Sequence, residues 1–121
     1  VLKASMVLSG KDCKTQANIS DVATQTIKCL KENVPHNLAG IVFLSGGQTD
    51  EKATAHLDAM NRMDKALRWP LSFSYGRALQ SQALKIWAIN KDIGRAQKAL
   101  VHRSRMNGLA AEGKYDEKLE N

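Results

Sequence analysis

The 121-residue sequence has few aromatic residues and no long apolar run, and each shortage excludes a class of protein. Phe, Trp and Tyr together make up 5% of the chain, too little for the base-stacking surface of a single-stranded nucleic-acid binder. No segment approaches the about 18 consecutive apolar residues that a membrane-spanning helix requires. The first ten residues are too lightly charged for a secretory signal. We therefore expect neither nucleic acid nor a membrane as a partner.

Cysteine and histidine are also sparse. Cys13 and Cys29 are far apart and form no CxxC motif, which is typical of a reduced, cytoplasmic protein rather than a disulfide-linked one. His36, His56 and His102 have no metal-ligand spacing with each other or with a cysteine. The sequence therefore predicts no bound metal.

Positive charge is the one excess, with a net charge of +6. The Lys and Arg residues are scattered, and the densest basic run, at residues 102–114, is interpreted as the solvated face of a helix. A basic balance of this kind also suits an anionic, phosphorylated substrate.

Short apolar runs alternate with longer amphipathic stretches, which predicts the order β-α-β-α-β-α-α. This alternation indicates an α/β architecture with parallel strands, either in a doubly wound sheet or in a (β/α)8 barrel. A barrel typically needs about 250 residues, so the chain would form about half of one. Because the sequence starts inside a predicted strand, we expect it to be part of a longer protein. Strands are predicted at residues 1–7, 40–47 and 70–76, helices at 19–33, 49–63, 77–90 and 92–113, and a polar, mobile tail at 114–121.

Two of the helices carry more detailed predictions. Ser20 is predicted to cap the helix at residues 19–33, because a serine hydroxyl can accept a hydrogen bond from a first-turn N–H. In the helix at residues 49–63, the spacing of Ala53, Leu57, Met60 and Met63 predicts one buried side.

Two predicted strands end in residues suited to binding an anion. Ser45 and Gly46 follow an apolar run and precede a helix, where free N–H groups favour a phosphate; the alternative is a turn in which glycine only supplies a positive φ. Ser74, Gly76 and Arg77 occupy the next strand-to-helix junction. The guanidinium of Arg77 could bind a phosphate or form a surface ion pair.

Lys3 lies within an apolar strand, which is unusual because an ammonium is costly to desolvate. Burial beside other cations would lower its pKa and leave a nucleophilic amine suited to Schiff-base formation. The alternative is a solvent-exposed lysine near a frayed terminus.

Three blocks occur in an order and at separations that resemble class I fructose-1,6-bisphosphate aldolase. They are LKASMV at residues 2–7, GIVFLSGGQ at 40–48 and WPLSFSYGRALQ at 69–80. The resemblance continues through TDEKATAHLDAMN, ALKIW and NGLAAEGKY, and so covers nearly the whole chain.

The resemblance implies the C-terminal part of a (β/α)8 TIM barrel, with residues 1–113 in the barrel. It also implies a cytoplasmic, glycolytic homotetramer that needs neither metal nor cofactor. Such an enzyme reversibly cleaves fructose 1,6-bisphosphate into dihydroxyacetone phosphate and glyceraldehyde 3-phosphate. Lys3 matches the Schiff-base lysine of the family. Ser45, Gly46, Ser74, Gly76 and Arg77 match residues around the substrate phosphate.

The chain departs from the family pattern at three points. Ala4 replaces a proline that usually follows the Schiff-base lysine, and the terminal tyrosine of animal members is absent. The family's acid/base residues match positions before residue 1, so we expect the 121 residues alone not to catalyse cleavage. The alternative hypothesis is a non-catalytic module that binds phosphorylated ligands or assembles with other proteins, using Ser45, Gly46 and Arg77.

Overall fold

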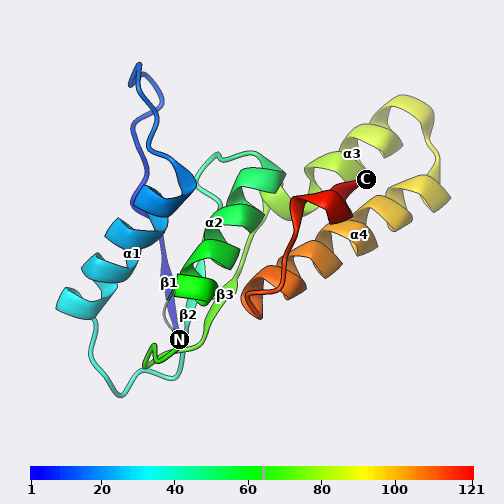
Figure 1. The fold of residues 1–121 in the computed structure, drawn as a ribbon. Helices are drawn as coiled ribbons and strands as arrows, with labels where there is room; N and C mark the ends of the chain where they lie inside the picture. The colour runs from blue at the N-terminus through cyan, green and yellow to red at the C-terminus, as the bar shows by residue number, and fades with distance from the viewer. Residues whose placement is uncertain (64) are drawn as a thin grey trace.

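The computed structural model describes residues 1–63 and 65–121, and it has the predicted order of elements. The tip of the α3–α4 hairpin points away from the sheet (Figure 1). Within the described ranges, the elements are β1 (Leu2–Ala4), α1 (Ile19–Asn33), β2 (Ile41–Phe43), α2 (Asp50–Met63), β3 (Leu71–Phe73), α3 (Arg77–Asn90), α4 (Ile93–Ala111) and a short 3-10 helix (Glu117–Glu120).

The three strands form a parallel sheet in the order β1-β2-β3. Each strand has three residues, fewer than the predicted runs of apolar residues, because regular pairing stops where the chain turns towards the next helix. Lys3, Val42 and Ser72 form the middle row of the sheet. The parallel α/β arrangement predicted from the sequence is thus present.

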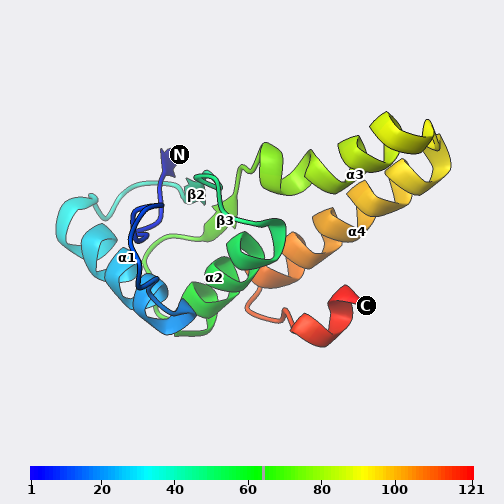
Figure 2. The ribbon, with the colours of Figure 1, turned by 90° about the horizontal axis from the view of Figure 1, so that it is seen from above.

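Helices α1 and α2 cover one face of the sheet (Figure 2). The strand residues on this face, among them Ile41, Phe43 and Leu71, are buried. Side chains alternate between the two faces of a strand, so the row with Lys3 and Val42 points to the opposite face. On that face Lys3 is exposed, and Val42 and Ser72 are half-buried.

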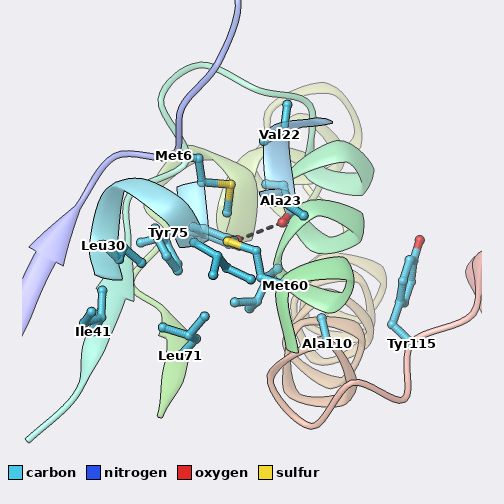
Figure 3. Close-up of a cluster of buried hydrophobic side chains, with 14 of the residues drawn as sticks. Met6, Val22, Ala23, Leu30, Ile41, Met60, Leu71, Tyr75, Ala110 and Tyr115 are labelled. Carbon is cyan, nitrogen blue, oxygen red and sulfur yellow. Dashed lines mark hydrogen bonds between the residues drawn. The ribbon is translucent and has the colours of Figure 1, made fainter. Parts of the chain in front are cut away.

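The core lies between the sheet and the helices. Met60 from α2, Leu30 from α1 and Leu71 from β3 converge there (Figure 3). Tyr75, just after β3, is buried beside them, and its hydroxyl donates a hydrogen bond of 2.8 Å to the carbonyl of Ala53. This bond satisfies a phenol that would otherwise be buried without a partner.

Two details of the helices differ from the sequence predictions. The N-cap of α1 is Asn18 instead of Ser20, because the Asn18 side chain accepts a 2.8 Å hydrogen bond from the N–H of Asp21. On α2, Ala53, Leu57 and Met60 are buried as predicted. Met63 is 45% exposed, because it lies at the last residue of the helix.

The polar tail packs against α2 and α4. Tyr115 is buried, its N–H donates to the carboxylate of Asp58, and its carbonyl accepts from Arg62. Glu120 forms a salt bridge of 2.8 Å with Arg103 of α4. Arg103 is therefore buried, although sequence analysis placed it on a solvated basic face. The tail thus contacts the helices through Tyr115 and through Glu120, and its polar composition did not predict these contacts.

Met60 and Met63 provide a matched pair that tests which side of α2 supports the core. Met60 is 0% exposed, so Met60→Ala leaves a cavity and should lower the free energy of unfolding by about 2–5 kcal/mol. Met63→Ala should lower it by less than about 1 kcal/mol, since Met63 is largely solvated. Urea denaturation measures both values, and equal losses would contradict this placement of the core.

Candidate functional site

The sheet brings the ends of its three strands to one edge. The N–H of Leu44 donates to the carbonyl of Ala4 at 3.0 Å, and the N–H of Ser74 donates to the carbonyl of Phe43 at 2.9 Å. These bonds continue the pairing beyond the strands. The segments after β2 and β3, which contain most of the predicted site residues, therefore start side by side.

The loop after β2 presents its backbone to solvent. Gly46 and Gly47 have φ angles of +60° and +79°, and both are exposed. Ser45 is only 6% exposed, and its carbonyl accepts a hydrogen bond from the N–H of Gln48, which closes the turn. The positive φ expected of a turn is therefore observed. The two exposed glycines also leave backbone groups accessible to an anion.

The segment after β3 supplies a helix N-terminus and a cation. Gly76 is the N-cap of α3, and no side chain caps this end of the helix. Arg77 is the first residue of α3 and is exposed. Within the described ranges, Arg77 is in none of the ion pairs. The carbonyl of Gly76 accepts from the N–H groups of Leu79 and Gln80.

Lys3 is the central residue of β1 and pairs in register with Val42 of β2. Its side chain belongs to the face that α1 and α2 do not cover. Lys3 is exposed, so the burial that would favour a neutral amine is not provided by the described residues. The structure thus brings the lysine strand beside β2, which the glycine loop follows, while β3 lies on the far side of β2.

In the described ranges, no group of three or more His, Cys, Asp or Glu side chains is arranged to hold a metal ion. In the same ranges, no helix is both long and apolar enough to cross a membrane.

A group of polar residues on the outer side of the glycine loop was not predicted from the sequence. Thr49, just before α2, is followed at helical spacing by Lys52 and His56 on α2, and this spacing was the available signal. His56 donates a hydrogen bond from Nδ1 to the side-chain oxygen of Gln48. Burial of the ring, together with the nearby Lys52 ammonium, lowers the pKa of His56 below its ordinary value of 6.5.

The backbone of the glycine loop can be tested by a matched pair of substitutions. An added Cβ at Gly46 would meet only ordinary contacts at 3.6 Å, but the φ of +60° disfavours any L side chain. Gly46→Ala should therefore cost about 1–2 kcal/mol of folding free energy. Gly10 has no positive φ and has open space around it, so Gly10→Ala should change the folding free energy by less than about 0.5 kcal/mol. Thermal unfolding of both variants checks the difference, and an equal cost would contradict the observed loop conformation.

The lowered pKa of His56 predicts a pH dependence of stability. The contribution of His56 to the free energy of unfolding is fully present above pH 6.5, because the unfolded chain takes up the proton more readily than the folded chain. It is lost as the pH falls through 6.5 towards the lower pKa of the folded state. His56→Gln should therefore lose less stability than the unsubstituted chain between pH 7.5 and 5.5. Urea denaturation at several pH values measures this, and identical pH profiles would contradict it.

Comparisons with known proteins agree with this geometry. The sequence model of the family described as "Glycolytic: Fructose-bisphosphate aldolase class-I" matches residues 1–121. A probable fructose-bisphosphate aldolase class 1 from Xylella fastidiosa is 56% identical over 95% of this chain and 35% of its own length. Fructose-bisphosphate aldolase C from Rattus norvegicus is 43% identical over 96% of this chain and 32% of its own length.

The fold also matches a solved structure. Plasmodium falciparum fructose-bisphosphate aldolase, in complex with TRAP and a small-molecule inhibitor, superposes with a TM-score of 0.89 and 40% identity. The match covers 95% of this chain and 33% of the Plasmodium chain. The chain thus spans about a third of the length of these relatives, less than the half expected from the strand pattern. Its three parallel strands and helices form part of an α/β barrel, and the chain belongs to the class I fructose-bisphosphate aldolase family.

Proposed function

We propose that these residues form part of the active site of an aldolase that reversibly cleaves fructose 1,6-bisphosphate to dihydroxyacetone phosphate and glyceraldehyde 3-phosphate. The single observation that carries this proposal is the common edge of the sheet. There the lysine strand β1 lies beside the exposed glycine loop, and the Gly76–Arg77 helix start follows the neighbouring strand. Family membership supplies the class of reaction.

In this proposal, Lys3 acts as the nucleophile. Its neutral amine adds to the C2 ketone of the sugar, and loss of water leaves an iminium. The C3–C4 bond then breaks, its electron pair moves towards the iminium nitrogen, and an enamine forms. The C4 hydroxyl loses its proton as C4 becomes the aldehyde of glyceraldehyde 3-phosphate. Protonation of C3 and addition of water release dihydroxyacetone phosphate and regenerate the amine.

The phosphate of the substrate is assigned to the two loops. Backbone N–H groups at Gly46 and the hydroxyl of Ser45 would donate from one side. The first turn of α3, with Gly76 and Arg77, would provide N–H donors and a planar cation from the other. Ser74 lies beside them, after β3. Holding the phosphate would place C2 against the Lys3 amine, which is catalysis by orientation.

The resemblance places the general acid and base of the reaction outside these 121 residues. The proton transfers at the C4 hydroxyl and at C3 therefore need groups that this chain does not supply. Such groups contribute about 100- to 10,000-fold to the rate. The cytoplasmic location, the homotetrameric assembly and the boundary between barrel and tail at residue 113 belong to the same proposal.

One observation favours the alternative function, a phospholigand-binding module without Schiff-base chemistry. Lys3 is exposed, whereas a Schiff-base lysine needs a neutral amine, which burial or neighbouring cations produce. In this alternative, Gly46 and Arg77 would still bind a phosphorylated ligand, and Lys3 would not react.

Borohydride trapping distinguishes the two functions. In the protein as expressed from its own gene, dihydroxyacetone phosphate and sodium borohydride should leave a covalent, reduced adduct on Lys3. The adduct is expected because reduction converts the transient imine into a stable secondary amine. Peptide mass spectrometry locates the modified residue.

Lys85→Arg, on the exposed side of α3, is the matched control and should leave the adduct unchanged, whereas Lys3→Arg should abolish it. Binding of dihydroxyacetone phosphate that depends on Arg77 but leaves no adduct on Lys3 would favour the non-catalytic alternative. An adduct on another lysine would contradict the role assigned to Lys3.

A further inference from the structure

A second cleft lies on the outer side of the glycine loop, and the proposed reaction does not use it. Its volume is about 750 Å³, within the range of about 300–1,000 Å³ found for small-molecule sites. The walls are the β1–α1 connection, the start of α1, residues 46–49 and one side of α2. We call it the outer cleft. Lys3, Ser74 and Arg77 do not line it.

The first turn of α2 turns its acids away from the outer cleft. The hydroxyl of Ser81 on α3 donates to the carboxylate of Asp50, with its oxygen 2.7 and 2.6 Å from the two carboxylate oxygens. Glu51 lies 3.4 Å from the guanidinium of Arg103 on α4. Thr49, Lys52 and His56, by contrast, line the cleft. The helix therefore presents a hydroxyl, an ammonium and an imidazole to the cleft.

The opposite wall contributes a second cation. Lys11 lies against the glycine loop, so close that a Cβ added at Gly47 would be 3.5 Å from its Nζ atom and 3.4 Å from its Cε atom. Both Lys11 and Lys52 are exposed, so their ammonium groups remain accessible to a ligand. Glu117 is the one carboxylate among the residues that line the cleft. An anionic group is therefore favoured between the two lysines.

The remaining lining contains polar side chains, such as Ser9 and Gln16, and an apolar part. Leu8 from the β1–α1 connection and Ile19 and Val22 from α1 contribute to the apolar part. Val22 is buried, whereas Ile19 is 37% exposed and can contact a ligand directly. Inorganic phosphate alone would leave this surface unused. The combination of apolar lining and two cations is typical of a site for a ligand with an anionic head and an apolar body.

We propose that the outer cleft binds a small organic phosphate, with its phosphate between Lys11 and Lys52 and its apolar body against Leu8 and Ile19. This site is separate from the proposed sugar-phosphate site and shares only the loop at Gly46 with it. Binding here does not depend on Lys3 chemistry.

Titration of the ¹⁵N-labelled protein, as expressed from its own gene, with phenyl phosphate tests the proposal, with inorganic phosphate and benzyl alcohol as partial ligands. Phenyl phosphate should shift the amide signals of Gly47 and Lys52 and bind at least about tenfold more tightly than either partial ligand. Equal affinity for phenyl phosphate and inorganic phosphate would overturn the proposal, as would the absence of saturable binding.

Variants locate the two parts of the site. The double substitution Lys11→Ala and Lys52→Ala should weaken phenyl phosphate binding by about tenfold. The matched control, Lys85→Ala with Lys98→Ala, removes the same charge from α3 and α4 and should change it less than about twofold. Equal weakening in both would mean that only net charge matters, which would overturn the proposal.

Ile19→Ser should weaken binding of phenyl phosphate but not of inorganic phosphate, and no change would overturn the apolar contact.

The two proposals can fail independently. Arg77→Ala should weaken binding of dihydroxyacetone phosphate and leave phenyl phosphate binding unchanged. Loss of phenyl phosphate binding in Arg77→Ala would place that ligand in the sugar-phosphate site and overturn the outer cleft as its site. Failure of Lys3 to form a borohydride adduct leaves the prediction for phenyl phosphate unaltered.

Discussion

Parallel pairing of the central strand β2 with both neighbours is the constraint on which the rest of the structure depends. Ile41 and Phe43 of β2 are completely buried, and their strand is hydrogen-bonded on both sides. Because the strands are parallel, all three chain segments leave the sheet at the same edge. The crossover helices must then return along one face. The position of Lys3 on the strand next to β2, which the glycine loop follows, results from this pairing.

The two faces of the sheet have different roles as a consequence. The face covered by α1 and α2 buries Ile41, Phe43 and Leu71 and provides the core. The other face carries Lys3, which is exposed, and Val42, which is half-buried. The core and the proposed reactive lysine thus lie on opposite faces of the sheet, because successive side chains of a strand point in opposite directions.

Local sequence signals predicted the elements well and their ends less well. The limits of α3 were predicted residue for residue, since the glycine before Arg77 and the break after Asn90 are strong local signals. The cap of α1 was misplaced because Asn18 and Ser20 are equally good capping residues, and only the path of the entering chain selects between them. The exposure of Met63 shows the same limit: periodicity defines a side of a helix, but not how far the sheet extends beneath it.

The sequence by itself determined the family, the order of elements and the identity of the candidate site residues. Lys3, Ser45, Gly46 and Arg77 all lie in motifs with characteristic spacing. Tertiary structure alone decided the burial of Arg103 by Glu120 in the tail and the outer cleft around Lys11 and Lys52. The physical reason is that burial and electrostatic environment depend on contacts between segments far apart in the chain, and local patterns do not record those contacts.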